Sequence, residues 1–244
     1  MKPHPYSRDD LSEIQHFDTC TVSNAIERFK VRLRNEGFVR GGLQCLFPSL
    51  PSVVGHAVPG RIKTATPPMM GGLYYDRTDW WDYILKIPAP RIIVMQDVDH
   101  YPGAGAFVGE IHANICRALD CIAYVTNGSV RDLHAVEQLG FQLFATNVSV
   151  SHAYAHIVEF GEPVEIGGLN IRPGDLLQGD RHGIQSIPES IVHEIPHMVP
   201  ELKAEEHRLI ALCQSPEFTL EKLGAMIGEM TKGVNNQDVN PKSK

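Results

Sequence analysis

The sequence predicts a single α/β domain with a parallel sheet at its centre and a helical arm at its C-terminal end. Three short apolar runs, RIIVMQ (91–96), CIAYVT (121–126) and FQLFAT (141–146), predict buried strands. Helical patterns separate them, and strands that alternate with helices at this spacing form parallel sheets through right-handed crossovers. After residue 160 the pattern changes to short antiparallel ribbons, and helical periodicity returns from about residue 189.

The segments before the first strand are expected to be helical at both ends and extended between. Residues 8–34 carry apolar side chains at roughly helical spacing, which predicts helix. Residues 37–72 are rich in glycine and proline, which favours turns and extended pieces. Residues 80–87, WWDYILKI, predict a short helix that leads into the first strand.

Two further helices are expected between the strands. The first opens after the loop at 97–110, DVDHYPGAGAFVGE. Its apolar face is expected to consist of Ile111, Ile115, Cys116 and Leu119. The second is expected near 132–139, after the turn TNGSVRD (126–132).

The second half of the chain should form ribbons and then the arm. Turns of the types GG, PGD and DRHG separate short alternating strands there, as in antiparallel ribbons. We expect residues 1–230 to form one domain, with 189–230 as its helical arm. The polar residues 231–244 are expected to be a disordered tail.

Composition excludes several classes of protein. The net charge of −7 argues against a nucleic-acid partner, which needs clustered Lys and Arg, and the basic run RFKVRLR (28–34) fits one solvated helix face. No apolar run approaches the ~20 residues that span a bilayer, and the N-terminal residues do not resemble a signal peptide. We therefore expect a cytoplasmic protein without a membrane partner. The five cysteines include no C-x-x-C pair, so reduced, buried thiols are expected.

Charged residues follow two neighbouring strands of the predicted sheet. Gly109 and Glu110 begin the helix after the first strand, and Arg131 and Asp132 follow the second. Ligands bind beyond the carboxyl ends of parallel strands, so two carboxylates, a guanidinium and free helix amides should converge there. Carboxylate oxygens and water suit a hard ion such as Mg²⁺, and arginine matches a carboxylate or an enolate. The sequence thus predicts a site for a small oxo acid.

A purely structural interpretation of the same residues remains open. Ser129 to Asp132 fits an S-x-x-D capping box, which would satisfy the first amides of the following helix. Glu110, in a first helical turn, complements the helix dipole. Arg131 does not fit this interpretation, because a cation in a first turn opposes the dipole.

Three segments resemble the RraA-like family, which includes 4-hydroxy-4-methyl-2-oxoglutarate aldolases. They are DTCTVSNAIERF (18–29), GEIHANICRALDCIAYVTNGSVRDLHAVEQLGFQLFA (109–145) and VEIGGLNIRPGDLLQGDRHGIQSIP (164–188). The resemblance covers roughly residues 15–210. It implies an αββα sandwich with a swivelling-domain-like β/β/α core, assembled as a homotrimer or hexamer with sites between subunits.

The resemblance also implies a role for each residue of the two pairs. Asp132 would be the direct ligand of a divalent metal, Mg²⁺ or Mn²⁺, and Glu110 would hold metal-bound water. Arg131 would bind substrate and stabilise an enolate. The implied substrate-binding positions are Gly109, Ile111, His112 and Arg131, with backbone amides near the middle two holding the carboxylate. An acidic residue near the C-terminus of a neighbouring chain would complete the site, and Glu205 or Glu206 is the candidate.

The implied reaction is a metal-dependent retro-aldol cleavage of a 4-hydroxy-2-oxo acid to pyruvate. A base deprotonates the 4-hydroxyl, the carbon–carbon bond breaks, and the pyruvate enolate is stabilised. Decarboxylation of oxaloacetate passes through the same enolate, so it is expected as a side activity. The alternative from another class is a non-catalytic RraA-type protein that binds and inhibits a ribonuclease. An inactive relative that serves as a structural partner is a third possibility.

Two positions depart from the family pattern. Asn127 stands where the family commonly has Asp, and His112 occupies a position that is usually apolar. Both could alter activity.

Other residues suggest weaker alternatives. His152 and His156 have the i, i+4 spacing of a zinc pair if helical. Asp175 and Asp180 in the PGD…D block most often serve turns, and Cys116 is best explained by structural burial. The glycines of GAGAFVG (103–109) match no complete phosphate-binding fingerprint.

Overall fold

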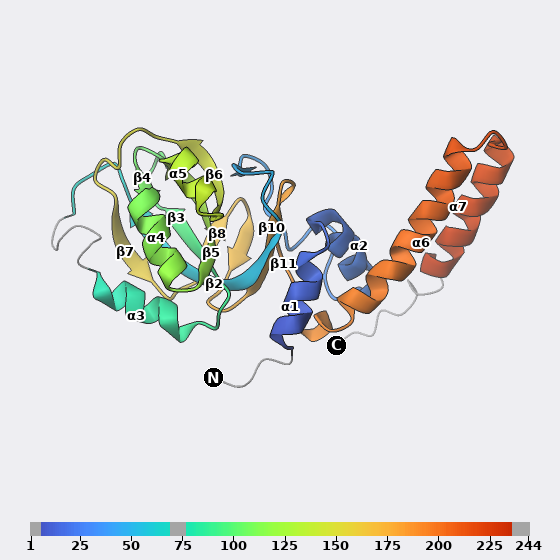
Figure 1. The fold of residues 1–244 in the computed structure, drawn as a ribbon, viewed down its shortest axis with the longest axis horizontal. Helices are drawn as coiled ribbons and strands as arrows, with labels where there is room; N and C mark the ends of the chain where they lie inside the picture. Colours follow the sequence, from blue (N-terminus) through green and yellow to red (C-terminus); the bar gives the residue numbers. More distant parts are fainter. Residues whose placement is uncertain (1–5, 69–76, 236–244) are drawn as a thin grey trace.

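The computed structural model describes residues 6–68 and 77–235, and a curved mixed sheet forms its centre (Figure 1). The strands of the sheet are β1 (Gln44–Cys45), β2 (Val53–Lys63), β3 (Arg91–Asp97), β4 (Ala106–Val108), β5 (Cys121–Val130), β6 (Gln142–Val148), β7 (His156–Phe160), β10 (Leu176–Asp180) and β11 (Gly183–Ser186). A separate ribbon pairs β8 (Val164–Ile166) with β9 (Leu169–Ile171).

The described helices are α1 (Arg8–Gln15), α2 (Thr19–Phe29), α3 (Thr78–Lys86), α4 (Glu110–Ala118), α5 (Leu133–Gln138), the 3₁₀ turn η2 (Glu189–Ile191), α6 (Ile195–Gln214) and α7 (Leu220–Asn235). Among the described residues, none of these helices is long and apolar enough to cross a membrane.

The strand order confirms the expected α/β class. The sheet runs β1-β6-β5-β3-β2-β10-β11, with β4 beside β5 and β7 beside β2. The three predicted strands are β3, β5 and β6. All pairs among neighbours here are parallel: β2 pairs with β3, β3 with β5, and β5 with β6. The later strands pair antiparallel, as the turn-rich second half predicts.

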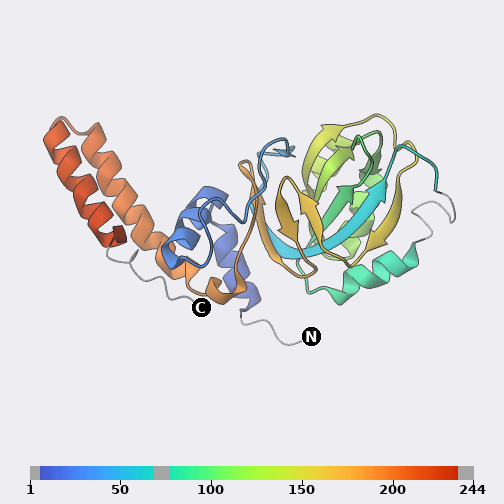
Figure 2. The ribbon, with the colours of Figure 1, turned by 180° about the vertical axis from the view of Figure 1, so that it is seen from behind.

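Alternate residues of β3 explain why its sequence is an uninterrupted apolar run. Ile93 and Met95 pack into the core shared with α3, α4 and α5, whereas Ile92 and Val94 pack into the core under the β8–β9 ribbon. A parallel strand covered on both faces needs apolar side chains at every position. The same arrangement gives the layered fold that Figures 1 and 2 show, with helices outside the β layers.

A third core joins the N-terminal helices to the base of the arm. Ile14 of α1, Ile26 of α2 and Val199 of α6 are its completely or almost completely buried members, packed against β2 and β10. Beyond this core, α6 and α7 project away from the body as a hairpin (Figures 1 and 2). The expected helical arm is therefore present.

The structure corrects three boundaries. Residues 8–34 form two helices, because Asp18 caps α2 through the Thr21 N–H (2.7 Å) and the left-handed Lys30 (φ 54°) ends it. Most of the basic run 28–34 is therefore not helical. α7 reaches Asn235, so the first residues of the expected tail are helical, and 236–244 lie outside the described residues.

Candidate functional site

The predicted pairs Gly109–Glu110 and Arg131–Asp132 meet because a short strand that the sequence did not predict, β4, joins the two loops. β4 runs parallel to the end of β5, with Ala106 opposite Ser129 and Val108 opposite Val130. β5 continues four residues beyond the predicted end at residue 126, and this extension pairs with β6 as well as with β4. The Arg131 N–H then donates to the Val108 carbonyl (3.0 Å), which holds the two loops side by side.

Asp132 caps a helix other than the one it precedes. Its backbone is left-handed (φ 56°), and its carboxylate makes no capping bond to α5. Instead Oδ2 accepts the N–H of Glu110 at the start of α4 (3.0 Å) and lies 3.3 Å from the Arg131 Nε. The capping-box interpretation is therefore wrong, because Ser129 belongs to β5 and its hydroxyl donates to the Gly103 carbonyl (2.7 Å).

Gly109 is required by the close approach of the two loops. A Cβ at this position would lie 2.3 Å from the Asp132 Oδ2 and 3.0 Å from the Arg131 Cγ. Real side chains do not tolerate the first distance, so any other residue would push the carboxylate or the helix start away. The glycine before Glu110 is thus a condition of the site's geometry.

A cavity of about 260 Å³, here called the candidate cavity, lies at this junction. It is lined by all six predicted site residues, Gly109, Glu110, Ile111, His112, Arg131 and Asp132, and also by Ala106, Phe107 and His152. The side chains of Arg131 and Asp132 are 35% and 37% exposed, so both reach solvent from its wall.

The start of α4 supplies positive polarity to the candidate cavity. The first intrahelical bond runs from the Ala113 N–H to the Gly109 carbonyl (2.9 Å). The N–H groups of Ile111 and His112 therefore belong to the first turn, which has no intrahelical acceptors. The Asp132 carboxylate accepts the Glu110 N–H, and the amides of Ile111 and His112 are suited to a carboxylate ligand.

The buried face of α4 differs from the predicted one. His112, Ala113 and Cys116 are buried, whereas the Ile111 side chain is 60% exposed. The His112 ring packs on Phe107 with a centroid distance of 4.5 Å, and burial lowers the pKa of His112 to about 4. The imidazole is therefore neutral near pH 7.

Asn127 has a structural task at the edge of the site. Its Nδ2 donates to the Asp97 carbonyl (2.9 Å), and its Oδ1 accepts the Asp97 N–H (2.7 Å). This pair of bonds ties the end of β3 to β5. A carboxylate has no donor for the first bond.

The donor set fits a hard divalent ion that keeps most of its water. Asp132 and Glu110 supply two carboxylates, and Mg²⁺ in proteins is commonly held by one or two carboxylates plus water and substrate oxygens. Among the described residues, no group of three His, Cys, Asp or Glu side chains could hold a metal by itself. The zinc alternative is wrong, because His152 lies in a loop and His156 begins β7.

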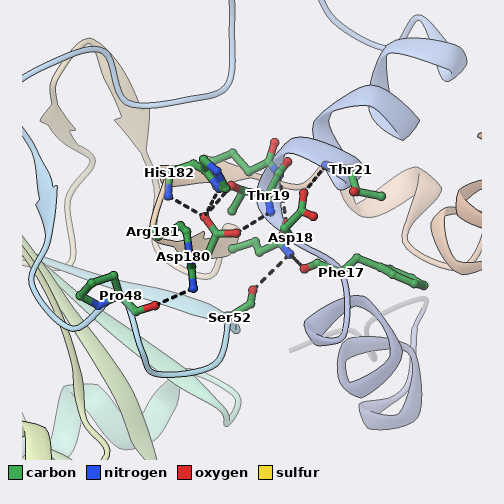
Figure 3. Close-up of polar contacts among 11 residues, drawn as sticks. Phe17, Asp18, Thr19, Thr21, Pro48, Ser52, Asp180, Arg181 and His182 are labelled. Atoms are coloured by element: carbon green, nitrogen blue, oxygen red, sulfur yellow. Dashed lines mark hydrogen bonds and ion pairs between the residues drawn. The ribbon is translucent and has the colours of Figure 1, made fainter. Parts of the chain in front are cut away.

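The two aspartates of the PGD block stabilise turns and junctions. Asp175 Oδ2 accepts the Arg172 N–H (2.7 Å) across the turn. Asp180 accepts the N–H and hydroxyl of Thr19 (2.8 and 2.7 Å) and the His182 N–H (2.8 Å), which joins α2 to the β10–β11 hairpin (Figure 3). Neither residue lines the candidate cavity.

The remaining alternatives have structural explanations within one copy of the chain. Cys116 is buried beside Cys121, and that thiol together with burial raises its pKa well above the usual value. Glu205 pairs with Arg28, and Glu206 accepts from the Asn24 Nδ2 (3.3 Å), so both lie between α6 and α2.

Ala106, Phe107 and His152 are the cavity residues that sequence reasoning missed. Phe107 belongs to β4, a strand that lies within the segment 97–110 expected to be a glycine-rich loop. His152 comes from the loop between β6 and β7. The i, i+4 spacing with His156 singles out His152, but as half of a helical zinc pair, and neither histidine is helical.

A larger cavity of about 460 Å³ lies at the opposite ends of β3 and β5, where it is lined among others by Arg8, Arg117 and Asp120. It contains no pair of converging carboxylates at a helix start. In an open α/β sheet, ligands bind at the carboxyl ends of the strands, which favours the smaller cavity.

Comparisons with known proteins identify the family and the fold. A family model described as "RraA-like: Aldolase/RraA" matches residues 19–185. The chain is 26% identical over 102 residues to the "Putative 4-hydroxy-4-methyl-2-oxoglutarate aldolase" of Halalkalibacterium halodurans. That alignment covers 41% of this chain and 49% of the relative, so the chain spans about half the length of this curated relative.

Solved structures share the fold. An uncharacterised protein of Pseudomonas syringae pv. tomato aligns with a TM-score of 0.69 and 22% identity, over 92% of this chain and 97% of that one. Streptomyces coelicolor RraAS2, titled an unusual member of the RNase ES inhibitor RraA protein family, aligns with a TM-score of 0.64 and 18% identity, over 85% and 98%. The family model spans most of the sequence and includes both residue pairs of the site, and the chain therefore belongs to the RraA-like family.

Proposed function

We propose that this protein is a divalent-metal-dependent lyase that cleaves a 4-hydroxy-2-oxo acid of the 4-hydroxy-4-methyl-2-oxoglutarate type to pyruvate. The observation that carries the proposal is the convergence of Glu110, Arg131 and Asp132 with the first amides of α4 on one cavity. Two carboxylates, a cation and a helix start meet the needs of a hard metal ion and an anionic substrate.

The protein groups have complementary tasks in this reaction. The amides of Ile111 and His112 bind the substrate carboxylate, and the Arg131 guanidinium stabilises the negative charge of the enolate. Asp132, with Glu110 through water, would hold Mg²⁺ or Mn²⁺, which polarises the 2-oxo group when bound. Phe107 and the buried His112 ring close the inner wall against water.

Decarboxylation of oxaloacetate should accompany the cleavage. Loss of CO₂ from oxaloacetate leaves the same pyruvate enolate, so the groups that stabilise it serve both reactions.

Measurement of pyruvate release tests the proposal. The purified protein is assayed with 4-hydroxy-4-methyl-2-oxoglutarate and with oxaloacetate, with Mg²⁺ and with a chelator, against metal alone. We expect metal-dependent turnover that falls at least about 100-fold in Asp132→Ala, because the only direct metal ligand is lost. Glu137→Gln, a carboxylate change on the exposed face of α5, should leave turnover intact.

A protein-binding regulator is the competing function, and the same assay separates the two. RraAS2 is titled a member of a ribonuclease-inhibitor family, so the fold also occurs in such proteins. A folded, metal-loaded protein that releases no pyruvate from either substrate would contradict the lyase proposal and favour the binding role.

We also propose that the protein works as a homotrimer or hexamer, with Glu205 or Glu206 of a neighbouring chain at the candidate cavity. Within one copy, both residues lie beside α2 and not at the cavity. Sedimentation of the full chain tests the assembly.

A further inference from the structure

His152 is the polar cavity residue that has no task in the proposed function. It lies on the wall of the candidate cavity with Arg131 and Asp132, although it comes from the loop between β6 and β7. The site therefore contains an imidazole in addition to its two carboxylates and its guanidinium.

The loop that carries His152 is fixed against β4 and the residue that precedes it. The Ser151 carbonyl accepts the Ala106 N–H of β4 (2.9 Å), and the His152 carbonyl accepts the Ala155 N–H (2.9 Å). A Cβ at Gly105 would lie 2.4 Å from the His152 carbonyl oxygen, so the two backbones touch. This contact keeps His152 at a constant place relative to the start of α4.

The hydrogen bond of the imidazole defines its tautomer. Nδ1 lies 2.9 Å from the Ala153 carbonyl oxygen, and a carbonyl can only accept, so Nδ1 carries the proton. The Nε2 of the neutral ring then holds a lone pair. Among the described residues, Nε2 has no hydrogen-bond partner.

The residue that receives this bond is held in an unusual conformation. Ala153 has a left-handed backbone (φ 45°), which is costly for a residue with a Cβ and without a side-chain hydrogen bond. In this strained conformation the Ala153 carbonyl holds the ring by Nδ1, and Nε2 is left available to exchange a proton.

We propose that His152 is the general base and acid of the cleavage, an inference that rests on the proposed function. Nε2 takes the proton of the 4-hydroxyl group while the C4–O bond becomes a carbonyl. The electron pair of the C3–C4 bond passes to C2–C3 and forms the enolate. Nε2 then returns the same proton to C3, which becomes the methyl group of pyruvate. One proton moves through one nitrogen, and no other reactant is needed.

The two activities of the site provide a test specific to this role. Cleavage begins with removal of a proton, whereas decarboxylation begins with loss of CO₂ and needs no base at that step. In His152→Ala we expect kcat for cleavage to fall about 100-fold and kcat for decarboxylation to fall by less than about tenfold, as general-base catalysis is worth at least the larger factor. Added imidazole should restore part of the cleavage rate. His156→Ala, the neighbouring histidine outside the cavity, serves as the matched control and should change neither rate.

Each other outcome has a definite meaning. Equal loss of both activities in His152→Ala, without rescue by imidazole, would show that His152 only maintains structure and would overturn this inference alone. Unchanged cleavage in the variant would overturn it as well. A wild-type protein inactive on both substrates would overturn the proposed function, and the role of His152 with it.

Discussion

Asp132 organises the candidate cavity because its carboxylate serves α4 and not its own helix. A left-handed residue points its side chain back across the turn, so Oδ2 reaches the Glu110 N–H and lies near Arg131. Aspartate tolerates this conformation better than most residues, because its short polar side chain bonds locally. One backbone angle thus links the proposed metal ligand, the cation and the helix start.

Gly109→Ala tests that link at the scale of a single atom. The new Cβ would meet the Asp132 carboxylate at 2.3 Å, so the carboxylate must shift. We expect turnover to fall about 100-fold, the effect of a displacement of about 1 Å in an active site. Pyruvate release and circular dichroism would measure activity and fold. Gly224→Ala in α7, where nothing lies within 4 Å, is the control, and a fully active Gly109→Ala protein would contradict the prediction.

Asn127→Asp tests why an amide stands at a position where the family commonly has a carboxylate. The variant loses the donor to the Asp97 carbonyl and brings a second negative charge close to Asp97. We expect the free energy of unfolding to fall by about 1–3 kcal/mol, the cost of an unsatisfied buried group. Urea unfolding measures it, with the exposed Asn170→Asp as control. Equal stability of the variant and the wild type would mean that the Asp97 bonds contribute nothing.

At the scale of elements, the junction between α2 and the β10–β11 hairpin depends on a buried carboxylate. Burial alone would raise the pKa of Asp180, but hydrogen bonds from Thr19 and His182 outweigh it and lower the pKa. A lowered folded-state pKa means that the carboxylate stabilises the fold above the unfolded value of about 3.9. The stabilisation is lost as the pH falls through the lowered value.

Asp180→Asn should therefore change both stability and its dependence on pH. At neutral pH we expect a loss of about 1–3 kcal/mol in the free energy of unfolding, because the amide cannot accept all the bonds of the carboxylate. The difference from wild type should shrink as the pH falls below the unfolded value and through the lowered folded-state pKa, because the wild-type carboxyl group then becomes protonated. Denaturant unfolding across this range measures it. The exposed Asp9→Asn provides the baseline, and a difference that stays constant with pH would exclude the carboxylate as its source.

At the scale of the whole molecule, the arm formed by α6 and α7 projects from the body, and beyond its base the rest of the described chain does not cover it (Figure 1). From Lys203 to Met230, no described residue is buried, and Ile210, Leu220 and Ile227 are 48%, 78% and 44% exposed. A two-helix hairpin gains little stability from its own contacts, since helices in water depend on packing of an apolar face. The arm is thus a natural place for contacts between subunits.

A chain that ends at Leu202 tests this interpretation. Because no residue from Lys203 to Met230 is buried, we expect the body to keep its circular dichroism and to melt within about 3 °C of the full chain. We expect its assembly to become smaller than the trimer or hexamer proposed for the full chain, as measured by sedimentation. An unchanged oligomer would show that the subunits meet elsewhere.

The sequence by itself determined the fold class, the three central strands and the two residue pairs of the site. It could do so because a strand buried on both faces must be apolar throughout, as in β3, and because loops after parallel strands share an edge. The sequence alone therefore predicts that Glu110, Arg131 and Asp132 lie together.

Only the tertiary structure decided how those residues meet. β4 is three residues long and gains its hydrogen bonds from β5, so no local pattern marks it. It pairs with the extended end of β5, which also pairs with β6; Ser129 is therefore part of a strand and not a cap, and Asp132 lies beside α4. His152 reaches the cavity through backbone contacts with Gly105 and Ala106, which are specific to the folded chain. Contacts between distant segments arise from the packing of the whole sheet, and this is why local sequence could not predict them.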